Sequence, residues 1–168
     1  MKLSAKGRYA VQAMSDIAVF GGDEKPIAIP EISLRQGISE TYLDQIFAKL
    51  RRAGLLESVR GAGGGYRLAQ PVSDIRIGAI VAAVDEQIKT TGCKPQDGKG
   101  CRGTSARCLT HDLWDELARQ IEIFLNTVTL EDVIARRVLG IASVQSPKTS
   151  EQIAVKNSLL ERVGSVER

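Results

Sequence analysis

The sequence predicts a mainly α-helical fold with one small β-hairpin, and three observations support this prediction. The chain is 43% hydrophobic but only 4% aromatic, so its core must consist mostly of Ile, Leu, Val and Ala, which suits helices. Apolar residues recur at helical spacing in most segments. A single segment reads as two short strands, and a run of glycines divides it.

The sequence of the first half of the chain predicts three helices in succession. Ser4–Phe20 has apolar residues along one face, with Ser4 in the N-cap position, and two glycines end it. A short β-like stretch, Ile27–Ile29, precedes a brief helix at Pro30–Gln36, because proline suits the first helical position. Gly37 tolerates positive φ and turns the chain into a third helix, Ser39–Arg52, which Ser39 can cap.

The third helix has two different faces. One face is apolar, and the opposite face is mostly polar, with Thr41, Asp44, Gln45, Ala48 and Arg52. Two helices that are joined by a tight glycine turn, the second with a polar outer face, form the helix-turn-helix pattern that inserts its second helix into the major groove of DNA. The alternative is an ordinary helical hairpin inside a protein core.

A glycine-rich hairpin favours the DNA-binding interpretation. Leu55–Val59 alternates as a strand, the run Arg60–Gly65 fits neither helix nor regular strand, and Tyr66–Leu68 returns as a second strand. Arg60 at the tip suits the negative potential of a narrow minor groove. A phosphate-cradling nucleotide loop is not supported, because the glycine spacing matches neither a dinucleotide fingerprint nor a P-loop. Residues 1–70 therefore predict a winged helix-turn-helix domain with the hairpin as its wing.

For the second half of the chain, the sequence predicts a connecting region (71–92), a long loop (93–111), a helical region (110–140) and a flexible tail (141–168). The connecting region holds a helix at Ile75–Glu86. The longest helix is expected at Thr110–Thr127, followed by a short one from Thr129 to about Leu139. A narrow apolar seam follows the long helix at alternating steps of three and four residues; its members are Trp114, Leu117, Ile121, Phe124 and Val128.

This seam predicts a dimerisation helix. A palindromic DNA site is best read by a two-fold homodimer, which favours a contact between subunits. Packing within one chain is the alternative. The predicted fold class is thus mainly α: a winged helix-turn-helix with a small β-hairpin wing, plus a long C-terminal dimerisation helix.

All three cysteines lie in the long loop, close to the one histidine of the chain. Cys93, Cys101, Cys108 and His111 are metal ligands within 19 residues, in the spacing C-x7-C-x6-C-x2-H. Three cysteines and one histidine can bind structural zinc or an iron–sulfur cluster. The wide gaps and the lack of a tight C-x2-C knuckle favour the bulkier cluster. Three unrelated thiols are the remaining alternative.

Composition limits the classes of function. The net charge of +3 and the pI near 8.8 are mildly basic, which is weak evidence for a nucleic-acid partner by itself. No apolar run is long enough for a membrane span, and the N-terminus has no signal peptide, so we expect a cytoplasmic protein with no membrane partner. An enzyme is the least supported class, because no catalytic arrangement is recognisable.

Several strings of the sequence resemble the IscR family of iron–sulfur cluster regulators, within a wider group of bacterial winged-helix repressors. The resemblance covers about residues 1–135. Its strings are MKLSAKGRYAVQAMSDIA, ISLRQGISETYLDQIFAKLRRAGLLESVRGAGGGYRL, VDE and CLTHDLW. The glycine-rich wing and the CLTHDLW string are specific to the family.

The resemblance implies a 2Fe–2S cluster as cofactor, a homodimer joined through the long helix, and control of iron–sulfur assembly and related iron and oxidative-stress genes. The cluster ligands that the resemblance implies are Cys93, Cys101, Cys108 and His111. The cluster-assembly machinery is the expected cluster donor, and palindromic promoter sites in double-stranded DNA are the expected target. The recognition helix is Ser39–Arg52, and the implied DNA contacts are Ser39, Thr41, Tyr42, Asp44, Gln45, Arg60 and Gly61.

The chain departs from the family pattern at two places. Asp44 stands where the family often has Glu, and this shorter side chain alters which bases it can contact. The cysteine gaps are longer than in the best-known members. The resemblance leads us to expect occupancy sensing, in which cluster-bound protein represses the assembly genes and cluster-free protein does not. A regulator of the same fold that senses nitric oxide or iron status, and a zinc-stabilised DNA-binding protein without sensing, are the alternatives.

Overall fold

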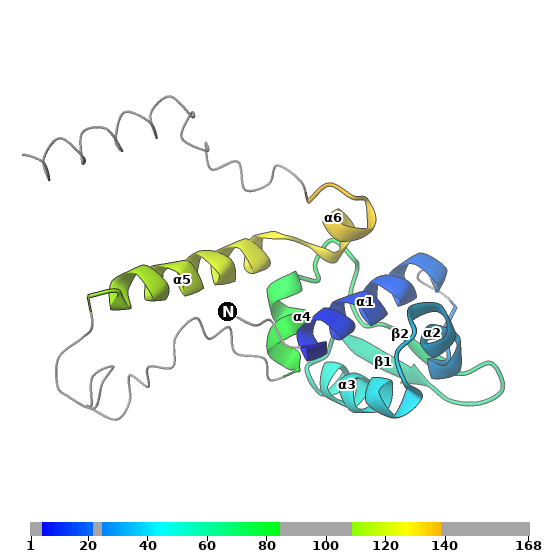
Figure 1. Cartoon of the computed structure of the whole chain (residues 1–168). Coiled ribbons are helices and arrows are strands. Elements are labelled where there is room, and N and C mark those ends of the chain that lie inside the picture. The colour runs from blue at the N-terminus through cyan, green and yellow to red at the C-terminus, as the bar shows by residue number, and fades with distance from the viewer. Residues whose placement is uncertain (1–4, 22–24, 85–108, 139–168) are drawn as a thin grey trace, which may run out of the picture. The chain divides into compact units, whose positions relative to one another are not determined.

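The structure is a computed structural model that describes residues 5–21, 25–84 and 109–138. It confirms a mainly helical chain with one antiparallel hairpin (Figure 1). The elements in order are α1 (Ala5–Phe20), α2 (Ile29–Gln36), α3 (Glu40–Arg52), β1 (Leu56–Val59), β2 (Gly65–Leu68), α4 (Ile77–Ala83), α5 (His111–Thr127) and α6 (Leu130–Ile134). The predicted flexible tail lies outside the described residues.

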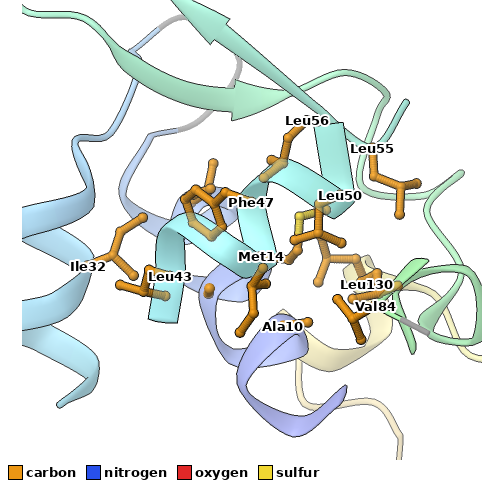
Figure 2. Close-up of a cluster of buried hydrophobic side chains, with 14 of the residues drawn as sticks. Ala10, Met14, Ile32, Leu43, Phe47, Leu50, Leu55, Leu56, Val84 and Leu130 are labelled. Atoms are coloured by element: carbon orange, nitrogen blue, oxygen red, sulfur yellow. The ribbon is translucent and has the colours of Figure 1, made fainter. Parts of the chain in front are cut away.

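Helix α1 is the central element of the fold. Its buried side is made of small and flexible residues, Ala10, Ala13 and Met14 among them, so neighbouring elements approach it closely. It contacts α2, α3, α4, α6 and strand β2. Figure 2 shows the resulting core, in which side chains of α1 lie against Leu43 and Phe47 of α3.

The hydrophobic core does not end at residue 70, where the sequence suggested a domain boundary. Five residues between positions 75 and 84, and two residues after α5, belong to the same buried cluster. They are Ile75, Ile77, Ile80, Val81, Val84, Val128 and Leu130. Residues 71–84 and 128–134 therefore complete the core of the winged helix, because that core lacks cover on the α1 side without them.

The turn between α2 and α3 has the predicted glycine geometry. Gly37 has φ of 66°, in the left-handed region, and its N–H donates to the Ser33 carbonyl at 2.9 Å. Ser39 occupies the N-cap position of α3, but its side chain makes no capping hydrogen bond. The hydroxyl of Ser39 is therefore not used to satisfy the first turn of the helix.

The wing pairs in a short antiparallel register, from Leu56 opposite Leu68 to Val59 opposite Gly65. The β-like stretch before α2 joins it as a single bridge, with the Ile27 N–H donating to the Tyr66 carbonyl at 2.9 Å. A side chain at Gly65 would collide with the Ile27 carbonyl. Gly61 has a φ of 103°, so hairpin geometry by itself explains part of the glycine run.

The long helix is attached to the winged helix at its C-terminal end. Residues 72–77 and 127–131 run antiparallel, with a bridge between Arg76 and Thr129. The Leu130 N–H donates to the Ile75 carbonyl at 2.8 Å, and the Ile77 N–H donates to the Val128 carbonyl at 3.0 Å. We call this the return pairing; it holds the end of α5 beside the start of α4.

Two predictions about the last helices were wrong. Val128, expected in the dimerisation seam, is 2% exposed and belongs to the core of its own chain. It follows α5 with extended backbone, because the return pairing draws the chain out of the helix there. The last helix was expected to reach about Leu139, but α6 ends at Ile134, and Arg136 adopts a φ of 56°.

An ion pair between a buried carboxylate and a partly exposed guanidinium joins α1 to α2. Asp16 is 2% exposed, and its carboxylate accepts hydrogen bonds from the Arg35 guanidinium at 2.6 to 3.1 Å. The Gln36 side-chain amide donates to the same carboxylate at 2.7 Å. The Arg35 guanidinium also lies over the Phe20 ring, 4.4 Å from its centroid. The hydrogen bond to Asp16 raises the pKa of Arg35, so the cation is kept at every accessible pH.

We expect Arg35→Met to lower the free energy of unfolding by about 3 kcal/mol, because the buried Asp16 carboxylate loses its guanidinium partner. Urea denaturation followed by circular dichroism measures the loss. The matched control is Arg67→Met, which breaks the exposed cross-strand pair with Glu57 and should cost less than about 1 kcal/mol. Equal losses of unfolding free energy in the two variants would mean that the burial of Asp16 does not make its ion pair more important for stability than an exposed one.

Candidate nucleic-acid interface

The outer face of α3 is the first part of the candidate interface. Thr41, Asp44 and Gln45 are all exposed on it, and Ser39 is exposed just before it. The opposite side of the helix holds the fully buried Leu43, Phe47 and Leu50. This polarity fixes the rotation of α3, because turning it about its axis would expose the core residues. The implied base contacts therefore share one solvent-facing side of the helix.

The wing is the second part, and α3 positions it. The Phe47 ring packs edge-on against the Tyr66 ring of β2, with centroids 4.8 Å apart. At the end of α3, Arg51 Nη1 donates to the Ser58 hydroxyl of β1 at 3.5 Å. The base of the hairpin is thus fixed to the recognition helix on both of its strands.

The wing tip carries Arg60 and Gly61, and both are exposed. Arg60 has no hydrogen-bond or ion-pair partner within the described part of the chain. The other arginine of the wing, Arg67, instead pairs with Glu57 across the strands at 2.9 Å. Arg60 is therefore the cation of the wing that has its charge available for a ligand.

The structure adds contacts around Tyr42 that the sequence did not indicate. Tyr42 is half-buried, and its ring meets the Tyr9 ring of α1 edge-on at 5.8 Å. The Arg8 guanidinium lies 5.5 Å from the centroid of the same Tyr9 ring. The first turns of α1 therefore lie beside the recognition helix. Helical periodicity reports faces within one helix, so it could not have placed these residues next to α3.

The predicted cluster ligands are only partly within the described residues. Cys93, Cys101 and Cys108 lie outside them. His111 is the first residue of α5 and is partly exposed, with Thr110 at the N-cap position. Within residues 5–21, 25–84 and 109–138, no group of three potential ligands gathers into a metal site. The histidine thus places one end of the predicted ligand set at the beginning of the long helix.

Helix α5 exposes its apolar face in the single chain. None of its 17 residues is buried, and Leu113, Trp114 and Ile123 are between 41% and 62% exposed. Leu117, Ile121 and Phe124 of the predicted seam are partly exposed. Hydrogen bonds from Arg119 and Gln120 lower the pKa of Glu116 to about 2, so this carboxylate stays charged well into acid. Among the described residues, no helix has the length and apolar character of a membrane span.

Proteins similar in sequence are transcriptional regulators. The chain is 50% identical over 147 residues to the HTH-type transcriptional regulator IscR of Vibrio parahaemolyticus serotype O3:K6, covering 86% of this chain and 84% of the relative. It is 47% identical over 150 residues to IscR of Serratia proteamaculans, covering 89% of each. These relatives confirm the resemblance read from the sequence.

Solved structures share the fold. IscR of T. potens matches with a TM-score of 0.65 and 37% identity, over 82% of this chain and 88% of that one. CymR, the global cysteine regulator of B. subtilis, matches with a TM-score of 0.67 and 29% identity, over 81% and 98%. A family model, Rrf2, described as an iron-dependent transcriptional regulator, matches residues 3–136. With its winged helix and these relatives, the chain belongs to the Rrf2 family of transcriptional regulators.

Proposed function

We propose that this DNA-binding regulator responds to a 2Fe–2S cluster, held by Cys93, Cys101, Cys108 and His111, and controls genes for cluster assembly. The main structural support is the position of His111. It opens α5, and the other end of α5 is hydrogen-bonded to the winged helix through the return pairing. A ligand of the proposed centre and the DNA-binding core are thus parts of one continuous element.

The donor set fits a 2Fe–2S centre chemically. Three thiolates and one imidazole suit iron and sulfide. Three thiolates also leave such a centre with a net negative charge, and the N-terminal end of a 17-residue helix favours an anion. The proposed ligands have Lys94, Lys99, Arg102 and Arg107 as near neighbours in the sequence, and such cations favour the thiolate forms. When bound, the centre would supply an iron site whose redox potential the histidine ligand raises.

Helix α5 would transmit the occupancy of the cluster site to the winged helix. Cys108 lies three positions before His111, so a filled site would fix the loop to the first turn of the helix. At the other end, Arg76 Nη1 donates to the Thr127 carbonyl at 2.9 Å. The Asn126 side chain lies directly against Gly78, where a Cβ would collide with it. A movement of α5 would therefore displace α4 and the core residues that pack against it.

We expect protein that is purified without oxygen to contain iron and sulfide and to absorb visible light as a 2Fe–2S centre. His111→Ala should retain less iron and lose colour faster in air, because the ligand at the start of α5 is missing. Elemental analysis and visible spectra measure both effects. Asp112→Ala, one residue along the same turn, is the matched control and should keep the centre. Stoichiometric zinc without iron in the parent protein would overturn the cluster proposal and favour a structural zinc site.

The output of the proposed sensor is binding to a palindromic promoter site. The exposed face of α3 would read base edges in the major groove, and Arg60 would enter the adjacent minor groove. In this arrangement Ser39, Thr41, Tyr42 and Gly61 supply the further predicted contacts. Asp44 is exposed on the same face as Gln45, and a carboxylate there accepts hydrogen bonds from cytosine and repels phosphates.

We expect Arg60→Ala to weaken binding to a target promoter by about 1–3 kcal/mol, because its side chain carries the charge of the wing tip. Gln45→Ala should reduce discrimination between target and mutated sites more than it reduces non-specific affinity. Fluorescence anisotropy with target and scrambled duplexes tests both. Arg67→Ala, whose charge is already paired on the wing, is the control for Arg60. Unchanged affinities in both Arg60→Ala and Gln45→Ala would contradict the proposed interface.

We further propose that α5 pairs with its copy in a homodimer. The apolar face of this helix has no cover in the described part of the single chain, and a second copy offers the same seam. Its proposed members are Trp114, Leu117, Ile121 and Phe124, without Val128. Two-fold symmetry would also present two recognition helices to the two halves of a palindrome.

We expect Ile121→Lys to convert the dimer to a monomer, because a charge would be buried in the apolar seam. Glu122→Lys, at the next position and outside the seam, should leave the dimer intact. Sedimentation equilibrium at several protein concentrations distinguishes the two states. A dimer of parental strength in Ile121→Lys would exclude this face as the interface.

A further inference from the structure

Two kinds of contact hold the last turn of α5 against the winged helix. The first is the return pairing, which joins residues 72–77 to residues 127–131 through backbone hydrogen bonds. The second is the packing of the Asn126 side chain directly against Gly78 of α4. A two-stranded ribbon can vary widely in its twist, so the backbone pairing alone leaves the angle of α5 loosely defined. The contact between Asn126 and Gly78 is what restricts that angle.

The glycine at position 78 is explained by this contact and not by its backbone. Gly78 is the second residue of α4, and it is not among the glycines with positive φ. Glycine is unfavourable inside a helix relative to alanine, so local structure gives no reason for it. A Cβ at this position would collide with the Asn126 side-chain oxygen and would lie 3.3 Å from the Asn126 backbone nitrogen.

The two atoms of Asn126 respond differently to added bulk at Gly78. The side-chain oxygen can rotate away, but the backbone nitrogen moves only if α5 moves with it. A side chain that is branched at Cβ therefore pushes the end of α5 away from α4.

Arg76 stabilises the same turn of α5. Its guanidinium Nη1 donates to the Thr127 carbonyl at 2.9 Å. This carbonyl lies at the C-terminal end of α5, where the helix dipole favours a cation. Together Arg76, Gly78, Asn126 and Thr127 form a joint between α4 and α5, which we call the α5 joint.

The length of α5 converts a small change at the α5 joint into a large displacement. The helix has 17 residues, which corresponds to a length of about 25 Å. A tilt of about 10° at one end of such a helix moves the other end by about 4 Å, more than the rise of about 3.4 Å for one base pair. In the proposed dimer, the angle at the joint therefore sets the separation of the two recognition helices.

We propose that Gly78 and Asn126 determine the half-site spacing, that is, the number of base pairs between the two halves of the promoter site that the dimer selects. Both residues act by positioning α5, and neither contacts DNA. A dimer reads a palindrome with two recognition helices at a fixed separation. When the separation does not match the site, the DNA must bend or twist, which weakens binding. The inference rests on the proposed homodimer and on its proposed DNA-binding face.

The test starts from duplexes that the full-length parent selects from a random pool, with base pairs then inserted or deleted between the half-sites. Gly78→Val adds a side chain that does not fit against Asn126. We expect its preferred spacing to shift by one base pair, and its affinity for the parental spacing to fall about tenfold. Its affinity for a duplex with a single half-site should stay unchanged, because α3 and the wing are intact. Fluorescence anisotropy measures each affinity.

Two further variants complete the test. Ala79→Val places the same side chain at the next position of α4, which is exposed, and should keep the parental spacing. Asn126→Ala removes the contact without adding volume, so it should bind neighbouring spacings more evenly than the parent does. It gives a result even if Gly78→Val does not fold.

Thermal unfolding and sedimentation equilibrium identify the variants that are folded and dimeric. If those variants rank the spacings as the parent does, the spacing role of the α5 joint is wrong. A parent protein that is monomeric, or that selects no palindrome, would instead contradict the proposed homodimer.

Discussion

The ion pair between the buried carboxylate of Asp16 and the guanidinium of Arg35 holds together the two helices on which the DNA-binding face depends. Helix α2 has eight residues and, within its range, buries only Ile29 and Ile32, so apolar contacts give it little to define its position. The carboxylate of α1 and the guanidinium of α2 restrict it, because any other arrangement leaves a buried charge without its partner. The tight turn at Gly37 joins α2 to α3, so the position of α2 also restricts the orientation of α3.

The recognition helix is held from three sides, and each contact has a different chemical character. Its buried face is apolar, and its wing edge is joined by an aromatic contact between Phe47 and Tyr66. Its α1 edge is joined by a second aromatic contact, between Tyr42 and Tyr9. Aromatic pairs have preferred geometries, so they fix the distance of α3 from its neighbours while its polar face stays open. A rigid helix with an open polar face is what reading base edges requires.

The long helix is connected to this frame at one end only within the described residues. The return pairing and the close approach of Asn126 to Gly78 fix its C-terminal end. Its remaining turns expose apolar side chains. In the proposed sensor the start of α5 holds a cluster ligand, its middle faces a second copy, and its end contacts the core. These three roles fall on one rigid element, so a change at any of them would bias the others.

Local rules were enough to predict much of the fold and part of the candidate site. The ends of α2, the left-handed Gly37, the glycine-rich hairpin and the buried face of α3 all depend on residues close together in the chain. Periodicity and backbone restrictions act over a few residues, so the sequence alone reports them. The cysteine and histidine spacing likewise predicts a ligand set, although three of its four members lie outside the described structure.

Contacts between distant segments were decided only by the tertiary structure. Asp16 and Arg35 are 19 residues apart, and no local pattern distinguishes them from solvent-facing charges. Val128 continued the apolar spacing of α5, yet the return pairing draws it into the core, because backbone pairing and burial there outweigh one more helical turn. The Tyr9 ring that packs on Tyr42, and the Arg8 guanidinium over it, come from α1 and cannot be linked to α3 by periodicity. The sequence by itself determined the elements and their exposed faces; tertiary packing decided which faces meet, because that depends on which buried groups find partners.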